Sequence, residues 1–418
     1  MTCKSCLEKD RIISELQEHI KQLEDKNRQL EEQVKEIKSW IWKPKQQTNK
    51  PKKLGPPKNH ESNNRPIPDK IHRRIKLAMH KCPECGHKLS KPVRTRKRYV
   101  EDIRPPEPMN TEYQIPYYWC KHCRKQVTPK PADAIPNCRF GIKLMLLITF
   151  FRYGISLPLN KMAKLLSTCY GISVSEGCLV DSITRFAEYA GPEFEQIKQD
   201  IRETTSTHID TTSWRINGQN KVLWDFISEE YMLLLVRDTK AQGIVYQTLG
   251  TDYKGISITD CASEYQYLGW KQQKCWVHLL RATRKLESIA GKKLHNRLKR
   301  LLELAKSSKV SKKALLSRLD RITRTKTKDE KCANIIKRLV KYRDSWFTFV
   351  DNKHVSYNNN AAERGLRPSV VMRKITGGNR SDKGARNHEV VMSVMGTWDK
   401  QGKDFLEYGM EYMANRLQ

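Results

Sequence analysis

Four short β-rich segments between residues 206 and 265 constrain the fold of this chain more than any other feature. The runs "STHIDTTSWRING", "KVLWDFISEE" and "YMLLLVRDT" are separated by turn residues, and "NGQN" is typical of a hairpin turn. A helical piece around "AQGIVYQTLG" follows, and "GISITDCASEY" then supplies one more strand. We therefore expect three antiparallel strands, a helix and a returning parallel strand.

This order of elements opens a ribonuclease H-like core, whose chemistry needs carboxylates on adjacent central strands, ~4.8 Å apart. Asp210 closes the first strand run and Asp260 ends "ISIT", and their spacing of 50 residues matches one hairpin, one strand and one helix. A third acid is required from a helix, and Glu363 supplies it if "NAAERGL" opens one. Such a site suits magnesium, which takes few carboxylates together with water and substrate phosphate.

Each acid also has a structural interpretation. Asp210 taken alone fits a structural role, and Glu363 fits an ordinary surface ion pair. Three neighbouring acids fit turn or cap positions: Asp225, Asp238 and Asp252.

The segment around Glu363, "YNNNAAERGLRPSVVMRK", combines one acid with many bases. If a helix starts here, Arg367 shares the face of Glu363 and Arg364 turns aside. The preceding asparagines 358–360 would form the turn and the cap. The basic residues that we expect to contact DNA phosphates are Arg364, Arg367, Arg373, Lys374 and Arg380.

Charge points to nucleic acid as the partner. The chain has 79 Lys and Arg against 46 Asp and Glu, a formal charge of +33 over 418 residues, which repels itself unless a polyanion offsets it. Histone-like packing proteins are usually short, whereas this length allows two or three domains with their own cores. An enzyme acting on nucleic acid therefore fits better.

About half of the excess charge lies between residues 281 and 350, where 22 Lys and Arg accompany 6 Asp and Glu on helical patterns. This insertion either covers DNA that flanks the site or presents a solvated helical face. Just before it, Trp276 and His278 in "CWVHLL" have two interpretations. Either they stack on a displaced base and contact a phosphate, or they are two core side chains whose hydrogen bonds are made within the protein.

The N-terminal region predicts a dimer. Apolar residues repeat at spacings of three and four from Ile13 to Ile37, with β-branched residues at one heptad position, mostly Leu at the other, and Asn27 to fix the register. The alternative is an amphipathic helix folded back on its own domain. Residues 43–70 then form a basic, Pro-rich tether that either screens phosphates or is only a linker.

Two Cys-x-x-Cys pairs follow, "CPECG" with Cys82 and Cys85, and "WCKHC" with Cys120 and Cys123. Four thiolates in two such pairs are typical of a structural zinc site, with no ligand position left for a substrate. The runs "TRKRYVEDI" and "EYQIPYYWC" between them alternate as strands of a zinc ribbon would. Cys3 and Cys6 repeat the spacing, and either have no role or bind metal across a dimer.

Residues 139–195 are helical in pattern. Within them the pattern predicts a helix-turn-helix: an apolar-periodic helix, a turn at Gly171, and a second helix with Ser173 and Ser175 as candidate N-caps. The second helix would enter a major groove. Two packed helices without DNA contact are the alternative.

No apolar run approaches the ~20 residues of a membrane span. The N-terminus "MTCKSCLEKD" has no apolar core of the signal-peptide kind. We therefore expect the twelve cysteines to be reduced or metal-bound in a cytoplasmic, nucleoid-associated protein without a membrane partner.

Four segments together resemble the DDE transposases of the insertion-sequence family numbered sixty-six: "HIDTTSWRINGQNKVLWDF", "GISITDCASEY", "QKCWVHLLR" and "YNNNAAERGLRPSVVMRKITGGNRSDKGA". The resemblance covers nearly the whole chain, because each part of the family has a match here in the same order. It implies that Asp210, Asp260 and Glu363 are the catalytic triad and hold two divalent cations, Mg²⁺ or Mn²⁺. The family often has Asp-Glu-Thr where this chain has Asp210, Thr211 and Thr212, which leaves the metal ligand in place.

The resemblance implies a transposase, dimeric or of higher order, that cuts at element ends and joins the freed 3′ hydroxyl to target DNA. Elements of this family commonly encode two small accessory proteins, which are possible partners. Two alternatives remain: a non-catalytic, sequence-specific DNA-binding regulator, and a structure-specific ribonuclease H-like nuclease that cuts and never joins.

We therefore expect a multidomain α/β protein with a ribonuclease H-like core that a helical insertion interrupts. The expected parts are a coiled coil (8–42), a basic Pro-rich linker (43–70), a zinc ribbon (71–130), a helix-turn-helix-like domain (139–200), the first part of the core (204–280), a basic helical insertion (281–355) and the second part of the core with the Glu363 helix (356–418).

Overall fold

The computed structural model describes residues 4–41, 68–92, 94–102, 106–129, 131, 134–136, 138–307 and 309–417, without the side chains of 4–12 and 35–41. The chain forms two units, Met1–Asp102 and Ile103–Gln418, and each is described here by itself. In the part described, no helix combines the length and the apolar character needed to cross a membrane.

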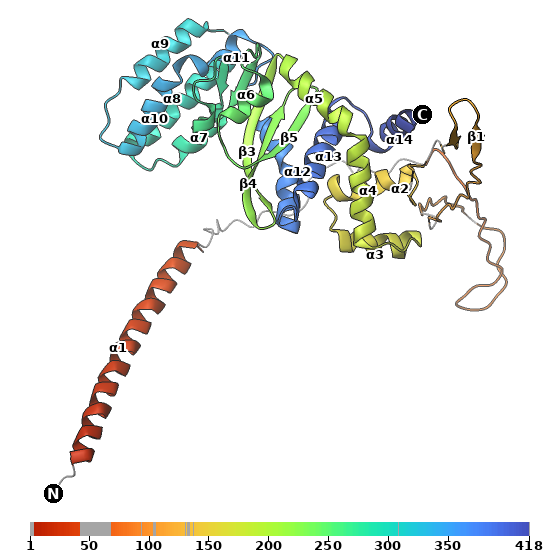
Figure 1. Ribbon diagram of the computed structural model, residues 1–418, viewed down its shortest axis with the longest axis horizontal. Coiled ribbons are helices and arrows are strands. Elements are labelled where there is room, and N and C mark those ends of the chain that lie inside the picture. The colour runs from red at the N-terminus through yellow and green to blue at the C-terminus, as the bar shows by residue number, and fades with distance from the viewer. Residues whose placement is uncertain are drawn as a thin grey trace. The chain divides into compact units, whose positions relative to one another are not determined.

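The first unit contains α1 (Lys4–Ile41), one uninterrupted helix (Figure 1). The apolar heptad residues whose side chains are described are all exposed: Ile13, Leu16, Ile20, Leu23, Leu30 and Val34. A helix with such a stripe is confirmed, while its pairing with a second copy stays a prediction. The linker predicted at 43–70 lies outside the described residues except for 68–70, as do Cys3 and the side chain of Cys6.

The strands predicted between the cysteine pairs form only in part. β1 (Tyr118–Cys120) pairs with β2 (Lys125–Val127) in a short antiparallel hairpin of the second unit. The described residues of "TRKRYVEDI", 95–102, form no strand, so that prediction is wrong. Their side chains are all exposed, and an alternating pattern without a partner ladder does not make a strand stable.

The stretch predicted to be helical, 139–195, forms four helices before the central sheet, and the last of them runs on to residue 203: α2 (Ile142–Tyr153), α3 (Leu159–Tyr170), α4 (Glu176–Tyr189) and α5 (Gly191–Glu203). Gly171 ends α3 in the left-handed conformation, with φ of 65°. Ser175, not Ser173, caps α4, because its hydroxyl accepts a hydrogen bond from Cys178 N. Contact of α4 with DNA stays a prediction.

The predicted mixed α/β class is confirmed by a five-stranded sheet in the order β5-β4-β3-β6-β7. Asn217 and Gly218 form the two-residue turn between β3 and β4, both with positive φ, as a type I′ hairpin requires. β6 and β7 run parallel to β3, and β7 is a strand that the sequence did not predict. The strands, with α6 among them, are β3 (Ser206–Ile216), β4 (Gln219–Ile227), β5 (Met232–Arg237), α6 (Gly243–Leu249), β6 (Ile256–Thr259) and β7 (Gln272–Lys274).

The outer strand of the sheet, β5, is covered by α13 (Asp382–Lys400). Side chains at every fourth position of α13 accept hydrogen bonds from the backbone N–H groups at every second position of β5. The pairs are Met232 with Thr397 (3.1 Å), Leu234 with Ser393 (2.9 Å) and Val236 with Glu389 (2.6 Å). The helix therefore satisfies donors that an open sheet edge leaves unpaired.

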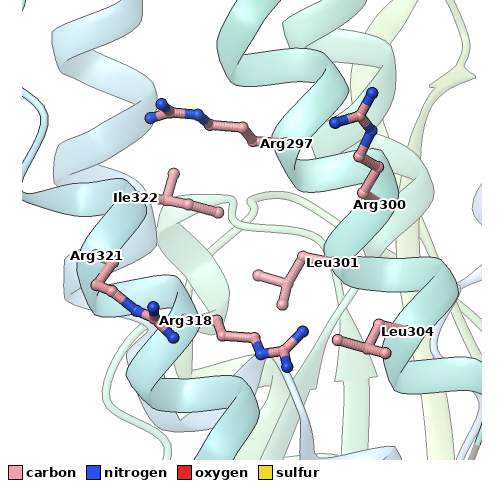
Figure 2. A pocket seen from close by; sticks show the side chains of 7 residues that line it. All are labelled: Arg297, Arg300, Leu301, Leu304, Arg318, Arg321 and Ile322. Carbon is pink, nitrogen blue, oxygen red and sulfur yellow. The ribbon is translucent and has the colours of Figure 1, made fainter.

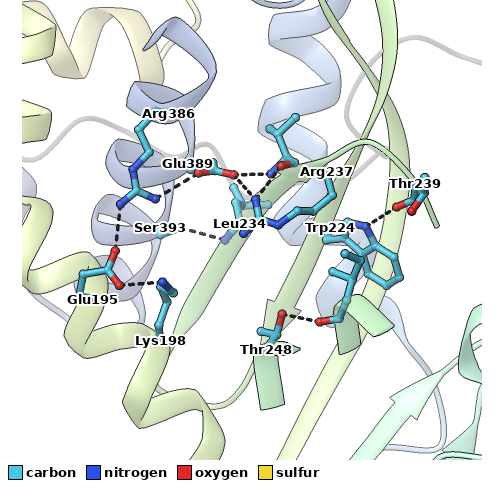
Figure 3. A network of polar contacts seen from close by, with 12 residues as sticks. Glu195, Lys198, Trp224, Leu234, Arg237, Thr239, Thr248, Arg386, Glu389 and Ser393 are labelled. Carbon is cyan, nitrogen blue, oxygen red and sulfur yellow. Dashed lines mark hydrogen bonds and ion pairs between the residues drawn. The ribbon is translucent and has the colours of Figure 1, made fainter. Parts of the chain in front are cut away.

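A charged network extends this contact to α5 (Figure 3). Glu389 accepts a hydrogen bond from Arg237 at 2.8 Å, and Arg386 joins Glu389 to Glu195 at 3.2 and 2.9 Å. These contacts fix α13 both to strand β5 and to helix α5, which leads into the sheet.

The insertion has a hydrophobic core of its own, separate from the core under the sheet. That second core includes Trp276, which precedes the predicted start of the insertion at residue 281. Its helices are α7 (Trp276–Arg284), α8 (Ile289–Lys306), α9 (Lys312–Thr323), α10 (Glu330–Lys341) and α11 (Thr348–Asp351), and Figure 1 shows α8, α9 and α10 grouped beside the sheet. The chain then returns to the sheet as α12 (Asn360–Thr376), α13 and α14 (Phe405–Leu417).

Candidate active site

Asp210 and Asp260 lie at the same level of two neighbouring strands. The parallel register of β3 and β6 pairs His208 with Ile258, and each aspartate comes two residues later on its strand. The sequence predicted Asp210 at the end of a strand, but it lies in the middle of β3. Asp260 directly follows β6, as predicted. The central pair of carboxylates is therefore built by strand pairing alone.

The electrostatic surroundings of Asp210 are those of a crowded anionic site. Its pKa is raised to about 6, first by burial and further by the negative charges of Asp260 and Glu363. A hydrogen bond from Thr211 N, 2.8 Å long, acts in the opposite direction. A divalent cation would relieve this repulsion, so the donor set suits a hard cation with oxygen ligands.

Asn359 brings α12 to these aspartates. It is fully buried; its Nδ2 donates to Ile209 O at 2.8 Å and its Oδ1 lies 2.9 Å from His208 Nδ1. Its backbone N donates to Cys275 Sγ at 3.2 Å. Glu363 follows one helical turn later and donates its N–H to Asn359 O, so this anchor sets the position of Glu363.

The sequence predicts a turn and a cap at Asn358, Asn359 and Asn360, and this prediction is right only in part. Asn358 Oδ1 does accept a hydrogen bond from Asn360 N, at 3.0 Å. Asn359, at the N-cap position, makes no side-chain cap and bonds to β3 instead. Nothing in the local sequence distinguishes this buried asparagine from its two neighbours.

A fourth acid, Asp225, lies under the site. It pairs with Asp210 across β3 and β4 and is completely buried, and neither of its carboxylate oxygens has a hydrogen-bond partner among the residues that the structure describes. Burial above all raises its pKa well above the ordinary value. Asp225 is thus no turn or cap acid, and a lone acid inside the apolar run "KVLWDFISEE" was the signal for its burial.

Gly365 allows α12 to approach this point closely. A Cβ built at Gly365 would lie 2.6 Å from Asp225 Oδ2, and it would also contact Ile227 Cδ1. Only a residue without a side chain fits here without displacement. Gly365 is two residues after Glu363, so the same close approach sets the height of Glu363 above the sheet.

The partner of Glu363 is Arg281 on α7. Arg281 Nη1 lies 2.6 Å from Glu363 Oε1 and Nη2 lies 3.2 Å from Oε2, while His278 Nε2 is 3.5 Å from Oε1. The bond from Arg281 is the main cause of the lowered pKa of Glu363. Within the residues described, no three His, Cys, Asp or Glu side chains are grouped closely enough to hold one metal ion.

The other residues predicted to contact DNA are placed as follows. Trp276 is completely buried, donates its indole N–H to Trp346 O and packs on Phe347, so the core interpretation describes it and base stacking does not. Arg373 is bound to Ser213 and Thr212 of β3. Four remain exposed: Arg364, Arg367, Lys374 and Arg380.

Replacing Arg281 by glutamine is expected to tighten Mn²⁺ binding to the DNA-free protein about two- to fivefold, because an exposed ion pair is worth ~0.2–1 kcal/mol. Electron paramagnetic resonance of free Mn²⁺ measures this. Arg284→Gln, one turn further along α7 and also exposed, is the matched control and should leave the affinity unchanged. Equal affinities of wild type and Arg281→Gln would show that Arg281 does not compete for Glu363.

Each cysteine pair sits on a tight turn. In the first unit, Cys82 N donates to His87 O and Gly86 N to Cys82 O, both at 2.9 Å, and Gly86 has φ of 72°. Backbone N–H groups of Cys85 and Glu84 lower the pKa of Cys82.

In the second unit, the turn after β1 likewise lowers the pKa of Cys120, chiefly through the backbone N–H of Cys123. Thiols whose ionised form is favoured in this way fit Zn²⁺.

Two family models match the chain. One, described as "Transposase IS66 family", matches residues 137–387, more than half of the chain, and includes all three proposed carboxylates. The other, described as "zinc-finger binding domain of transposase IS66", matches residues 80–124, which contain Cys82, Cys85, Cys120 and Cys123. The second match supports a structural zinc ion in this segment.

One curated protein is similar over a shorter stretch. It is "Uncharacterized protein y4hP" of Sinorhizobium fredii (strain NBRC 101917 / NGR234), 25% identical over 118 residues. The aligned stretch covers 27% of this chain and 21% of that protein.

Proposed function

The chain belongs to the IS66 family of transposases, and we propose that it cuts DNA at the ends of a mobile element and joins the freed 3′ hydroxyls to target DNA. The observation that carries this proposal is the pair Asp210 and Asp260 on adjacent parallel strands, with Glu363 held nearby through Asn359. The strand order of the sheet supports a ribonuclease H-like core for this chemistry.

In this proposal Asp210, Asp260 and Glu363 supply the carboxylate oxygens of the site. Two divalent cations, Mg²⁺ or Mn²⁺, would activate the attacking oxygen and stabilise the leaving one. Burial beneath Asp210 raises the pKa of Asp225 and so opposes the addition of a further negative charge next to the site.

Arg281 has two roles in succession. In the protein without DNA it neutralises Glu363 through two hydrogen bonds. When Glu363 turns to the aspartates, the guanidinium of Arg281 becomes available to a phosphate of the DNA, for which its paired N–H groups have the right geometry. This exchange keeps the charge of the site balanced before and after substrate binding.

The remaining parts of the chain supply DNA binding and assembly. The exposed stripe of α1 supports a dimer or a higher oligomer through a coiled coil. The pair α3 and α4, with its short turn and Ser175 cap, supports a helix-turn-helix that contacts the element ends. Small accessory proteins of the same element are further candidates for partners.

The proposal is tested with the full-length protein, a duplex that carries the terminal repeats flanking its gene, and a supercoiled target plasmid. We expect Mg²⁺-dependent cleavage at the repeat end and a joined product in the plasmid. Binding without cleavage would favour a DNA-binding regulator, and cleavage without any joined product would favour a structure-specific nuclease. Either result contradicts the proposed transposition chemistry.

A further inference from the structure

A groove with a volume of about 490 Å³ lies between α8 and α9 of the insertion. Each helix contributes two arginines spaced three residues apart, Arg297 and Arg300 from α8 and Arg318 and Arg321 from α9. Leu301, Leu304 and Ile322 lie between them (Figure 2). The groove therefore has basic rims and an aliphatic floor.

The charge of these arginines is not balanced by the protein. α8 contains one acid, Glu303, which pairs with Lys306, and α9 contains one, Asp320, which pairs with Arg343 through two bonds of 2.8 Å. Within the described part of the chain, none of the four groove arginines forms an ion pair. Among the described residues, their one polar contact is from Arg297 to the Thr325 hydroxyl, at 3.3 Å.

Four unpaired guanidinium groups this close together repel one another, so the groove is suited to a multiply charged anion. Guanidinium groups bind phosphate through two parallel N–H bonds. The described residues that line the groove include no aromatic side chain, so they offer no platform on which the bases of a single strand would stack.

We propose that this groove binds the phosphate backbone of duplex DNA. The arginines on its two rims contact phosphates, and the leucine and isoleucine floor contacts the apolar edge of the deoxyriboses between them. Such contacts position the duplex without reading its sequence. The groove is distinct from the carboxylate site and extends the protein's contact with DNA beyond the cleaved bond.

The inference rests on the proposed function for the identity of the polyanion, but its test does not depend on cleavage. The full-length protein with all four groove arginines replaced by glutamine is compared with the wild type in binding two duplexes, one with the terminal repeat and one scrambled, without added Mg²⁺. Affinity is measured over a range of salt concentrations.

We expect the slope of log K against log salt to become less negative by about 0.9 for each phosphate that the variant no longer neutralises, or roughly 2 to 4 in all. The decrease in affinity should be the same for both duplexes. The matched control replaces four exposed lysines of the same two helices, and these are Lys292, Lys293, Lys299 and Lys313. It removes the same charge outside the groove and should change the slope much less.

Equal changes in the two variants would overturn the proposal, because net charge alone would then explain the binding. An unchanged slope in the groove variant would overturn it as well. Loss of polyglutamate binding with intact DNA binding would assign the groove to an acidic protein segment instead. Thermal unfolding shows whether both variants are folded, and end cleavage at saturating DNA shows separately whether the catalytic proposal holds.

Discussion

Asp260→Ala is expected to lower Mg²⁺-dependent cleavage of an end duplex on the order of 10³-fold or more, because losing a cation ligand removes several kcal/mol of transition-state stabilisation. Binding of the duplex should remain, since the basic side chains proposed to contact DNA lie on other elements. Asp260 directly follows β6 and is only partly buried, so the alanine should not disturb the sheet. Cleavage rates and duplex affinity are measured on the same preparation.

Asp252→Ala is the control for this experiment, because Asp252 is an exposed acid in the loop that leads into β6. A third variant, Asp260→Cys, tests the role as a ligand directly. Its sulfur should restore cleavage with Mn²⁺ better than with Mg²⁺, since Mn²⁺ is the softer cation. Full cleavage by Asp260→Ala would remove Asp260 from the site.

Gly365→Ala is expected to reduce cleavage by about 100-fold, because a shift of ~1 Å in a catalytic group has an effect of this size. The new methyl group would meet Asp225 Oδ2 and Ile227 Cδ1, and α12 can relieve this only by moving away from β4 with Glu363. Overpacking should also lower the free energy of unfolding by roughly 1–3 kcal/mol. Cleavage at saturating DNA and urea unfolding measure the two effects.

Gly409→Ala separates these effects. A Cβ at Gly409 would lie 2.9 Å from a methyl group of Leu146, in the packing of α14 on α2, which is remote from the carboxylates. It should cost similar stability but leave the cleavage rate of folded protein unchanged. Adding Ile227→Val to Gly365→Ala removes one of the two clashes and should restore part of the activity. Equal cleavage rates for both glycine variants would contradict the proposed role of Gly365.

The regular parts of the fold could be predicted from sequence because they depend on local patterns. The turn at Asn217 and Gly218, the strand before Asp260 and the helix that begins near Glu363 each carry a signal within a few residues. The heptads likewise predicted the helix α1. The two predicted aspartates came together because parallel strands in register require it.

The contacts that position Glu363 could not be predicted in this way. Asn359 bonds to Ile209, which is 150 residues away in the chain, and Arg281 reaches Glu363 across 82 residues. Trp276 shows the same limit, because the sequence could not decide between base stacking and the insertion's core. Such choices depend on which segments meet in space, and one sequence does not contain that information in any local pattern.

The cover of α13 over β5 has a consequence for how the protein is made. Met232 leaves the ribosome 165 residues before Thr397, its partner on α13. At ~5–20 residues per second, the edge of the nascent sheet therefore stays open for roughly 8–33 s. A chain that stops early, for example through a frameshift in the insertion, would never close this edge. We expect such fragments to accumulate in inclusion bodies or to be degraded, rather than to persist as competing DNA-binding proteins.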